Sequence, residues 1–416
     1  MQEIIQTYTQ RFQVKPPFFQ DVPAMDLCLI VVIPSFNEPD IRDTLNSLHQ
    51  CKRPKGTVEV IIVINAAATS SQSVLEANQK TVDQIESWKD QHKQGVLQIK
   101  VIREEKLAAN KAGAGWARKI GMDEALRRWG MLGKDGPILC LDADCEVSPD
   151  YFQAAQRGFS DPAIKLAHFQ FDHPYRLETD QQLQLGIIQY ELHLRCYIQG
   201  LKWAGYPFAC HTVGSCMAVK ASAYARSGGM NRRKAGEDFY FMHKLLPVNG
   251  FTYLSGTVYP SCRISDRVPF GTGRAQLEYL AASNPEKVTY HPDIYRCMRS
   301  FFIQVPLFYS QKAEELDLPN PIHEFLKEVN FESQVEEIRR QSSSKAAFFK
   351  RFWQWMDGFM VLKLTHYLRD RYFPNLPVKT AGKELLFLLS GHPQKSELTD
   401  LLEGFRALDS FHFSSG

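Results

Sequence analysis

Several features that would assign this chain of 416 residues to a simple class are missing from its sequence. The 49 Lys and Arg nearly balance the 46 Asp and Glu, and the net charge is +3, so no basic excess indicates a nucleic-acid partner. No C-x-x-C pair occurs among the nine cysteines, which argues against zinc ligation and favours buried free thiols. The sequence also contains no internal repeat and no low-complexity tract.

Long apolar runs are missing too. No stretch reaches the roughly 18 apolar residues of a membrane-spanning helix, and residues 1–20 lack the apolar core of a secretory signal. These absences predict a soluble, cytoplasmic protein. A content of 44% hydrophobic and 23% charged residues is typical of a globular chain, and the length is sufficient for two or three domains.

The first third of the chain alternates short apolar runs with helix-like segments. The runs are rich in β-branched residues and lie at 27–33, 58–64, 97–102 and 137–141. Between them, apolar residues recur at the three- and four-residue spacing of helices that bury one face. Strand and helix in regular alternation predict a three-layer α/β fold with a parallel sheet.

Two carboxylates, Asp142 and Asp144, follow the fourth of these runs in the stretch ILCLDADCEVSPD. Ser148 and Pro149 predict the start of a helix, so the strand has to end just before them. Open parallel sheets bind ligands at the carboxyl ends of their strands, and hard carboxylate oxygens suit Mg²⁺ or Mn²⁺ together with substrate phosphates. The alternative is that D-x-D, a short and common pattern, caps a helix or faces solvent.

Glu237 and Asp238 form a second acidic pair, placed before the apolar stretch FYFMHKLL at a predicted helix start. Negative charge at that position is favourable in itself because of the helix dipole. The functional alternative makes one carboxylate a general base that is aimed at a substrate hydroxyl.

Three arginines, Arg263, Arg267 and Arg274, lie in the glycine-containing segment RISDRVPFGTGRA. A guanidinium group fits phosphate oxygens, and the glycines would let the loop close over a ligand. Plain solvated charge explains the same pattern. A nicotinamide dinucleotide site is not favoured elsewhere, since AGAGWARKIG has Arg118 at the third glycine position of that fingerprint.

The region after about residue 285 is predicted to be helical, with the segments 322–341 and 345–373 joined by the serine-rich break QSSSK. Trp353 and Trp355 lie there among phenylalanines, interleaved with Lys350 and Arg351. Such a stretch either lies on a membrane surface, near a lipid-linked acceptor, or forms a core helix.

Taken together, residues of about 27–275 resemble the family 2 glycosyltransferases with the GT-A fold. The resemblance implies a Rossmann-like three-layer sheet of the GT-A type, with the C-terminal helices as an extension outside the likeness. IPSFNE at 33–38 is similar to the family's first-strand turn, so Pro34, Phe36 and Glu38 would contact the nucleotide. Arg118, in NKAGAGWARKIG, occupies the place of an arginine near the nucleotide.

The same resemblance assigns the acidic and small-residue motifs. Asp142 would lie near the donor ribose, and together with Asp144 it would bind Mn²⁺ or Mg²⁺ on the diphosphate. Gly214 and Ser215 match the acceptor-side turn. In GEDFYF, the aspartate of the Glu237 and Asp238 pair would be the base of an inverting enzyme.

The implied activity is an inverting, metal-dependent and hexosyltransferase-like transfer from a nucleotide-diphosphate sugar. The acceptor would be a hydroxyl of a saccharide, a lipid-linked molecule or a small molecule, and the arginine loop would contact the diphosphate. The implied organisation is an N-terminal extension at 1–26, a nucleotide-sugar half at 27–150, an acceptor and catalytic half at 151–285 and a helical region at 286–416. The protein would be cytoplasmic, with peripheral membrane contact as an open alternative.

Two rival functions stay open, the first because of a departure from the family pattern and the second because nucleotidyltransferases also use carboxylates and Mg²⁺ on an α/β sheet. Asn65 stands at the donor-binding place where the family commonly has Asp-Asp-Gly-Ser. A catalytically silent sugar-nucleotide-binding protein is therefore one alternative. A nucleotidyltransferase is the other, although SFNEPD is acidic where that class needs a glycine-rich, basic loop. No histidine stands where some relatives add a metal ligand, and His243 is expected to pack or to face solvent.

Overall fold

The computed structural model describes residues 1–92, 97–231, 236–267, 271–282, 286–392 and 397–410. These residues form two compact units. Unit 1 holds Met1–Leu183 and Thr212–Glu278, and unit 2 holds Gln184–His211 and the described residues of 279–410. The domain boundary expected at 285, and the last residues of the expected helical region at 411–416, lie outside the described residues.

Unit 1 is built on a sheet of eight strands in the order β3-β2-β1-β4-β7-β6-β8-β5. The strands are β1 Leu27–Ser35, β2 Thr57–Ala67, β3 Leu97–Leu107, β4 Pro137–Cys140, β5 Cys145–Val147, β6 Leu166–Phe171, β7 Met217–Lys220 and β8 Phe251–Pro260. β1 to β4 are mutually parallel, as the alternating rhythm predicts. The second half of the sheet is mixed, because β7 runs antiparallel to both β4 and β6.

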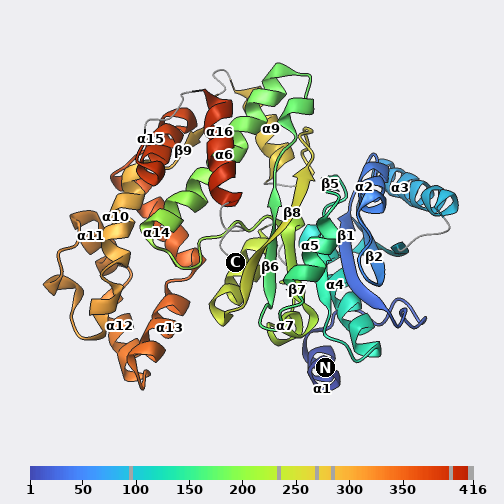
Figure 1. The fold of residues 1–416 in the computed structure, drawn as a ribbon, viewed down its shortest axis with the longest axis horizontal. Helices are drawn as coiled ribbons and strands as arrows, with labels where there is room; N and C mark the ends of the chain where they lie inside the picture. Colours follow the sequence, from blue (N-terminus) through green and yellow to red (C-terminus); the bar gives the residue numbers. More distant parts are fainter. Residues whose placement is uncertain (93–96, 232–235, 268–270, 283–285, 393–396, 411–416) are drawn as a thin grey trace. The chain divides into compact units, whose positions relative to one another are not determined.

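Most helices of unit 1 lie in the connections between these strands, while α1 precedes β1 and α9 follows β8 (Figure 1). The helices are α1 Gln2–Phe12, α2 Arg42–Gln50, α3 Gln72–Gln91, α4 Ala114–Met131, α5 Tyr151–Gly158, α7 Ala221–Arg226, α8 Glu237–Leu245 and α9 Thr272–Ala281, with the 3-10 helices η1 Tyr175–Leu177, η2 Gly214–Cys216 and η3 Leu246–Val248. The helix predicted to have Ser148 as its N-cap and Pro149 as its first residue begins at Tyr151 instead. Its N-cap is Asp150, whose carboxylate accepts a hydrogen bond from the Ser148 hydroxyl at 2.7 Å.

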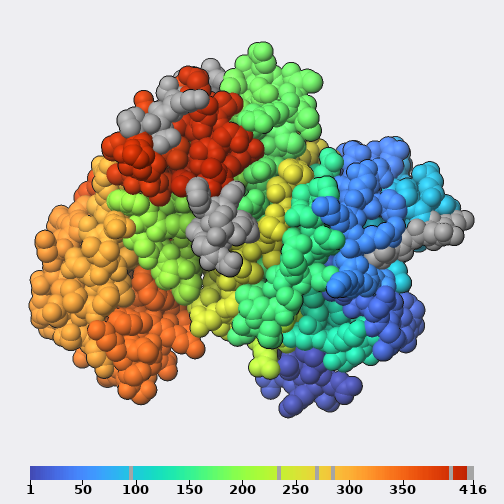
Figure 2. Space-filling model, in the orientation of Figure 1, coloured from blue at the N-terminus to red at the C-terminus, as the bar shows by residue number. Residues whose placement is uncertain are grey.

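The sheet and α4 pack closely because apolar side chains cover both. β1 and β2 are buried along almost their whole lengths. At Gly121 of α4, an added Cβ would lie 2.4 Å from Cγ1 of Val32, so only glycine allows this approach of helix to strand. Helix α1 is attached to the same unit through Tyr8, which donates to Asp123 Oδ1 at 2.6 Å. Figure 2 shows α1, in dark blue, against the rest of unit 1.

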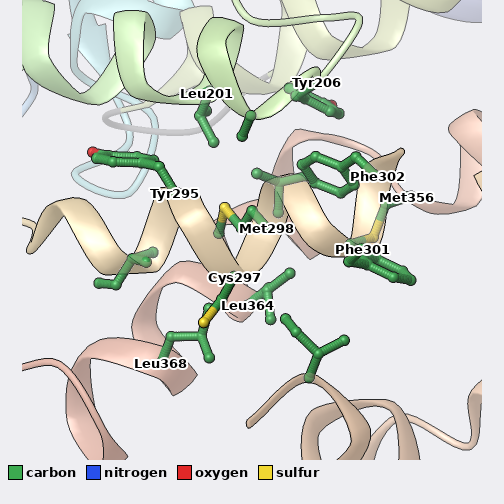
Figure 3. Packing of buried hydrophobic residues seen from close by; sticks show 14 of the residues in the cluster. Leu201, Tyr206, Tyr295, Cys297, Met298, Phe301, Phe302, Met356, Leu364 and Leu368 are labelled. Carbon is green, nitrogen blue, oxygen red and sulfur yellow. The ribbon is translucent and has the colours of Figure 1, made fainter. Parts of the chain in front are cut away.

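Unit 2 is helical and has a core of its own. Its elements are α6 Gln181–Ala204, α10 Pro292–Phe302, η4 Val305–Tyr309, η5 Ala313–Glu315, α11 Asn320–Glu328, α12 Phe331–Arg340, α13 Lys345–Trp355, α14 Gly358–Arg371, α15 Val378–Ser390, α16 Leu398–Ser410 and the short strands β9 Val288–Thr289 and β10 Leu376–Pro377. Figure 3 shows α10 contributing Met298 and Phe301 to a core that Leu201 of α6 and Leu364 of α14 complete.

The fold class expected from the sequence, α/β with a C-terminal helical extension, is confirmed. Phe348 and Phe352 of α13 are fully buried in unit 2, and Trp353 and Trp355 pack against the same core. All nine cysteines are free thiols, of which only Cys28 is not fully buried. Within the described ranges, no helix combines the length and the apolar character needed to span a bilayer.

Candidate active site at the carboxyl edge of the sheet

The turns that follow β1 and β4 meet at one edge of the sheet. The two strands are parallel neighbours, so their carboxyl ends lie side by side and bring Glu38 and Asp144 close together. Residues after the end of β8 approach the same edge and supply Arg263 and Arg267. The edge therefore collects charged side chains from three separate parts of the sequence.

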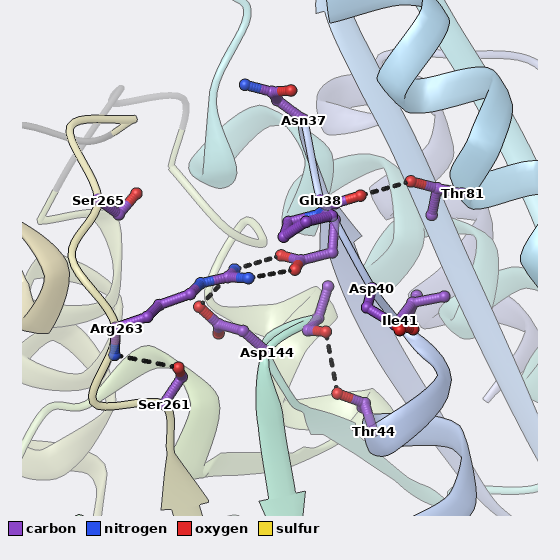
Figure 4. A network of polar contacts seen from close by, with 12 residues as sticks. Asn37, Glu38, Asp40, Ile41, Thr44, Thr81, Asp144, Ser261, Arg263 and Ser265 are labelled. Carbon is purple, nitrogen blue, oxygen red and sulfur yellow. Dashed lines mark hydrogen bonds and ion pairs between the residues drawn. The ribbon is translucent and has the colours of Figure 1, made fainter. Parts of the chain in front are cut away.

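Arg263 bridges the two carboxylates at this edge. Its Nη1 and Nη2 donate to the two oxygens of Glu38 at 2.5 Å and 2.6 Å, and Nη2 also donates to Asp144 Oδ2 at 2.9 Å. Figure 4 shows the guanidinium between both acids. The Glu38 pair is bidentate, which is the geometry in which arginine binds a carboxylate most strongly.

Arg267 reinforces this cluster, whereas Arg274 lies apart from it. Arg267 Nη1 donates to Glu38 Oε2 at 3.0 Å and to the carbonyl oxygen of Phe36 at 3.0 Å, and its Nη2 lies 3.5 Å from Asp144 Oδ2. Arg274 instead pairs with Glu278 one helical turn along α9, at 2.8 Å. Two of the three predicted phosphate-binding arginines are thus held at the acidic edge.

Arg118 connects the second acidic motif to the first. It lies on α4, is 4% exposed, and donates one guanidinium nitrogen to Asp142 and the other to Glu237. Those two carboxylates are 95 positions apart in the sequence and come from the end of β4 and the start of α8. A buried guanidinium between them offsets the repulsion that two approaching anions would otherwise feel.

The small residues of the predicted acceptor-side turn support Arg118. Gly214 begins η2, and a Cβ placed there would lie 2.7 Å from both terminal nitrogens of the guanidinium. Ser215 is buried beside it, and its hydroxyl contacts Cys216 Sγ at 3.7 Å. The absence of a side chain at Gly214 is therefore what admits the arginine.

Asp238 follows Glu237 in the first turn of α8. Gly236, at the N-cap, has a φ of +69°, in the left-handed region that favours glycine, and this turns the chain into the helix. The backbone N–H of Phe239 donates to Asp238 Oδ1 at 2.7 Å. Burial, and then the neighbouring charge of Glu237, raise the pKa of Asp238 to about 6, against the lowering effect of Arg118.

The pKa of Asp144 is also raised. Desolvation is the largest cause, and the Arg263 guanidinium opposes it. Because desolvation disfavours the ionised form of Asp144, a further cation nearby would stabilise that form.

Asn65 and Pro34 hold the framework of the site. Asn65 is buried at the end of β2, where its Nδ2 donates to the carbonyl of Ser35 and its Oδ1 accepts from the N–H of Gly113, both at 3.2 Å. Pro34 lies within β1 opposite Val63 of β2. Both the oxygen and the nitrogen of the Asn65 amide thus bond to backbone groups and hold β2 to its neighbours.

Sequence reasoning missed the polar residues that shape the β1 turn. Asn37 has a φ of +49°, and its N–H donates to Oδ1 of Asn78 at 3.0 Å. Thr81, one turn further along α3, donates to the carbonyl of Glu38 at 3.0 Å (Figure 4). Asn78 and Thr81 are polar and fully buried on a helix, a signal that periodicity alone does not separate from an exposed polar face.

The acids of this edge suit a divalent cation that needs few protein ligands, such as Mg²⁺ or Mn²⁺. Within the described part of the chain, no group of three or more His, Cys, Asp and Glu side chains is arranged to hold a metal. Asp142 and Asp144 offer hard oxygens, which suit an ion that takes one or two carboxylates and completes its shell with phosphate and water. His243 is not a candidate ligand. It packs on the Phe239 ring with centroids 4.5 Å apart, and burial lowers its pKa to about 4.

Comparisons with known proteins give one family and several structures. Residues 30–226 match the family model described as Glycosyl transferase family 2. The chain is similar to TarS residues 1–349 of S. aureus in complex with UDP-GlcNAc, with 14% identity, a TM-score of 0.40 and coverage of 93% of this chain and 92% of the other. It is also similar to the mannosyltransferase PcManGT of Pyrobaculum calidifontis in complex with GDP-Man and Mn²⁺, with 14% identity, a TM-score of 0.36 and coverage of 98% and 92%. No curated protein matches the sequence.

Proposed function

We propose that this glycosyltransferase, whose residues 30–226 match the Glycosyl transferase family 2 model, moves a sugar from a nucleotide-diphosphate donor to an acceptor hydroxyl with inversion of configuration. The observation that carries this proposal is the bridge made by Arg118, which ties Asp142 of the D-x-D motif to Glu237, the neighbour of Asp238. In this proposal the donor-side acid and the neighbour of the acceptor base are linked through one buried guanidinium.

The donor would lie across the carboxyl edge of the sheet. Asp142 and Asp144 would hold Mn²⁺ or Mg²⁺, which supplies positive charge against the diphosphate when bound. Arg263 and Arg267 pair with Glu38 and Asp144 at this edge, and in this proposal they would exchange those carboxylates for phosphate oxygens of the donor. In this proposal Arg274 takes no part, because its guanidinium is engaged with Glu278.

Asp238 would act on the acceptor. Its raised pKa makes it a stronger base than an ordinary aspartate while leaving it ionised near neutral pH. The carboxylate takes the proton of the acceptor hydroxyl as that oxygen forms a bond to the anomeric carbon. On the opposite face, the bond from that carbon to the phosphate oxygen breaks and the nucleoside diphosphate departs with the electron pair. Attack opposite the leaving group inverts the configuration.

The remaining assignments rest on the resemblance to the family. Residues 27–150 would bind the nucleotide sugar, with Pro34, Phe36 and Asn65 shaping the donor side. Residues 151–285 would bind the acceptor, with Gly214 and Ser215 on its side of Arg118. Residues 1–26 and 286–416 would be the N-terminal extension and the helical region. The acceptor would be a saccharide, a lipid-linked molecule or a small molecule.

The substitution Asp238→Asn tests the proposal. It removes the base but keeps the shape, so we expect transfer to fall by about 10²- to 10⁴-fold while the Kd for the donor stays within about twofold. Transfer is measured as nucleoside diphosphate released over a panel of acceptors, and binding by calorimetry with Mn²⁺ present. The matched control is Asp83→Asn, an exposed acid on α3, which should leave both quantities unchanged.

Two results would count against this proposal. Unchanged turnover in Asp238→Asn would remove the aspartate from the reaction. Metal-dependent nucleotide binding without turnover on any acceptor would favour a catalytically silent binding protein. That alternative is open because Asn65 stands where the family commonly has an acidic residue.

A further inference from the structure

Unit 2 carries a surface made by residues 299–312 and 339–356, which we name the basic face. The first segment is the end of α10 with η4, and the second is the end of α12 with α13 (Figure 1). Arg339 Nε donates to the carbonyl of Phe308 at 2.8 Å, and the rings of Tyr309 and Phe348 lie 5.5 Å apart. The two segments are therefore in contact and form one surface.

The charge of the basic face departs from that of the whole chain. Its segments contain seven basic residues and no acid, although acids and bases are nearly equal overall: Arg299, Lys312, Arg339, Arg340, Lys345, Lys350 and Arg351. Lys345, Lys350 and Arg351 are exposed on α13, and none of them pairs with a carboxylate among the described residues. Unpaired cations are thus concentrated on one helix.

Apolar side chains stand beside these cations. Ile303 is 62% exposed, Leu307 41% and Tyr309 39%, all within seven consecutive residues. The intervening Val305 and Phe308 are fully buried and fix the turn on the core of unit 2. Exposed apolar residues that occur singly are ordinary on soluble proteins, whereas a rigidly supported group next to unpaired cations is typical of a binding surface.

We propose that the basic face docks on an anionic lipid surface. Ile303, Leu307 and Tyr309 enter the boundary between headgroups and acyl chains, and the cations of α13 lie near the headgroup phosphates. Charge complementarity decides between occupants. Arg340 and Lys312 pair with Glu337 and Glu314 at the border of this surface, so the cations of α13 carry the argument. A second copy of this chain, placed face to face, would bring two sets of these like charges together, while an anionic bilayer meets them with opposite charge. This inference does not depend on the proposed function.

Vesicle flotation of the full chain tests the docking. We expect the protein to float with vesicles of phosphatidylcholine and phosphatidylglycerol at low salt, to stay behind with phosphatidylcholine alone, and to be released as salt is raised. Lys350→Glu combined with Arg351→Glu should lower the partition coefficient at least about tenfold, because each cation near an anionic surface contributes measurably. Ile303→Ser combined with Leu307→Ser should lower it by a similar factor.

Matched controls test whether the effect is specific to the basic face or follows from any change of surface charge or hydrophobicity. Lys52→Glu combined with Arg53→Glu reverses the same amount of charge at exposed neighbouring positions of unit 1. Leu177→Ser removes an apolar side chain of unit 1 that is 81% exposed. Both should leave flotation unchanged, and thermal melting verifies that every variant is folded.

The proposal is overturned if the unaltered chain does not float, if it floats equally with phosphatidylcholine alone, or if the unit 1 controls reduce flotation as much as the basic-face variants. It is also overturned if light scattering shows a dimer that the basic-face variants dissociate, since a second copy would then cover this surface.

Discussion

Asp238 illustrates how its surroundings set the chemistry of a single residue. Burial and the adjacent charge of Glu237 raise its pKa to about 6, while Arg118 acts in the opposite direction. The same carboxyl in an unfolded chain would titrate near 3.8. The folded protein therefore retains a proton on Asp238 at mildly acidic pH, where ordinary aspartates are ionised.

The proposed role of Asp238 predicts a pH dependence of transfer. A base acts only when it is deprotonated, so kcat/KM should rise with pH and level off above a midpoint near 6. The measurement is a pH profile with saturating donor. A midpoint near 4, or a rate that falls as pH rises through this range, would contradict the assignment.

Stability gives an independent check of the same pKa. Between the unfolded value of 3.8 and the folded value of about 6, the folded state holds more protons than the unfolded state. The free energy of unfolding therefore decreases as pH rises through this window. Asp238→Asn has no buried carboxyl to ionise. Its free energy of unfolding in urea at pH 8 should therefore exceed that of the unaltered chain by about 1 to 3 kcal/mol. The advantage should vanish below pH 4.

Among the elements of the fold, the short η2 has the most direct effect on the site. Arg118 can reach Asp142 and Glu237 only because Gly214 presents no Cβ to its guanidinium. Gly214 is held in place because η2 leads directly into β7 at Met217. An element of three residues thus sets the space available to a buried ion-pair network.

Gly214→Ala tests this element. The new Cβ would stand 2.7 Å from the guanidinium nitrogens, so Arg118 must move and its pairing with both carboxylates weakens. We expect a loss of about 1 to 3 kcal/mol in the free energy of unfolding, together with at least tenfold lower transfer. Gly382→Ala on α15 is the control, since its nearest neighbours lie at 3.5 Å or more. Equal effects from both substitutions would show that the Arg118 contact is unimportant.

At the scale of the whole molecule, the chain consists of two units that each bury their own apolar side chains. The sheet of unit 1 carries the charged site, and the helical unit 2 carries an aromatic core around α10. Phe301 is fully buried there, with its ring 5.7 Å from that of Phe308 and 5.9 Å from that of Phe331.

Phe301→Ala should reveal the independence of the two cores. The cavity left by the ring is expected to cost about 3 to 5 kcal/mol in the stability of unit 2. Hydrogen exchange followed by mass spectrometry should show faster exchange in peptides of α10, α13 and α14, with β1 and β2 unchanged. Phe387→Ala, at a position of unit 2 that is 49% exposed, is the control and should leave exchange unaltered. Loss of protection throughout the chain would indicate a single cooperative unit instead.

Features that depend on residues close in the sequence were predictable, whereas features that depend on distant residues were not. The runs at 27–33 and 58–64 predicted strands correctly, because apolar patterns are local in sequence. The direction of β7 was not predictable, since a strand of four residues carries no information on which neighbours it joins. Arg118 and Glu237 were each singled out, but nothing in the spacing of positions 119 apart indicated that they pair.

By itself, the sequence determined the alternation of strands and helices, the place of the acidic motifs beside strand and helix ends, and the resemblance to family 2 glycosyltransferases. Those features depend on residues a few positions apart, where periodicity and capping act. Only the tertiary structure decided that Arg263 and Arg267 meet Glu38 and Asp144, while Arg274 remains with its helical neighbour. Charge pairing across a sheet edge depends on how distant strands are ordered, and packing of the whole core fixes that order.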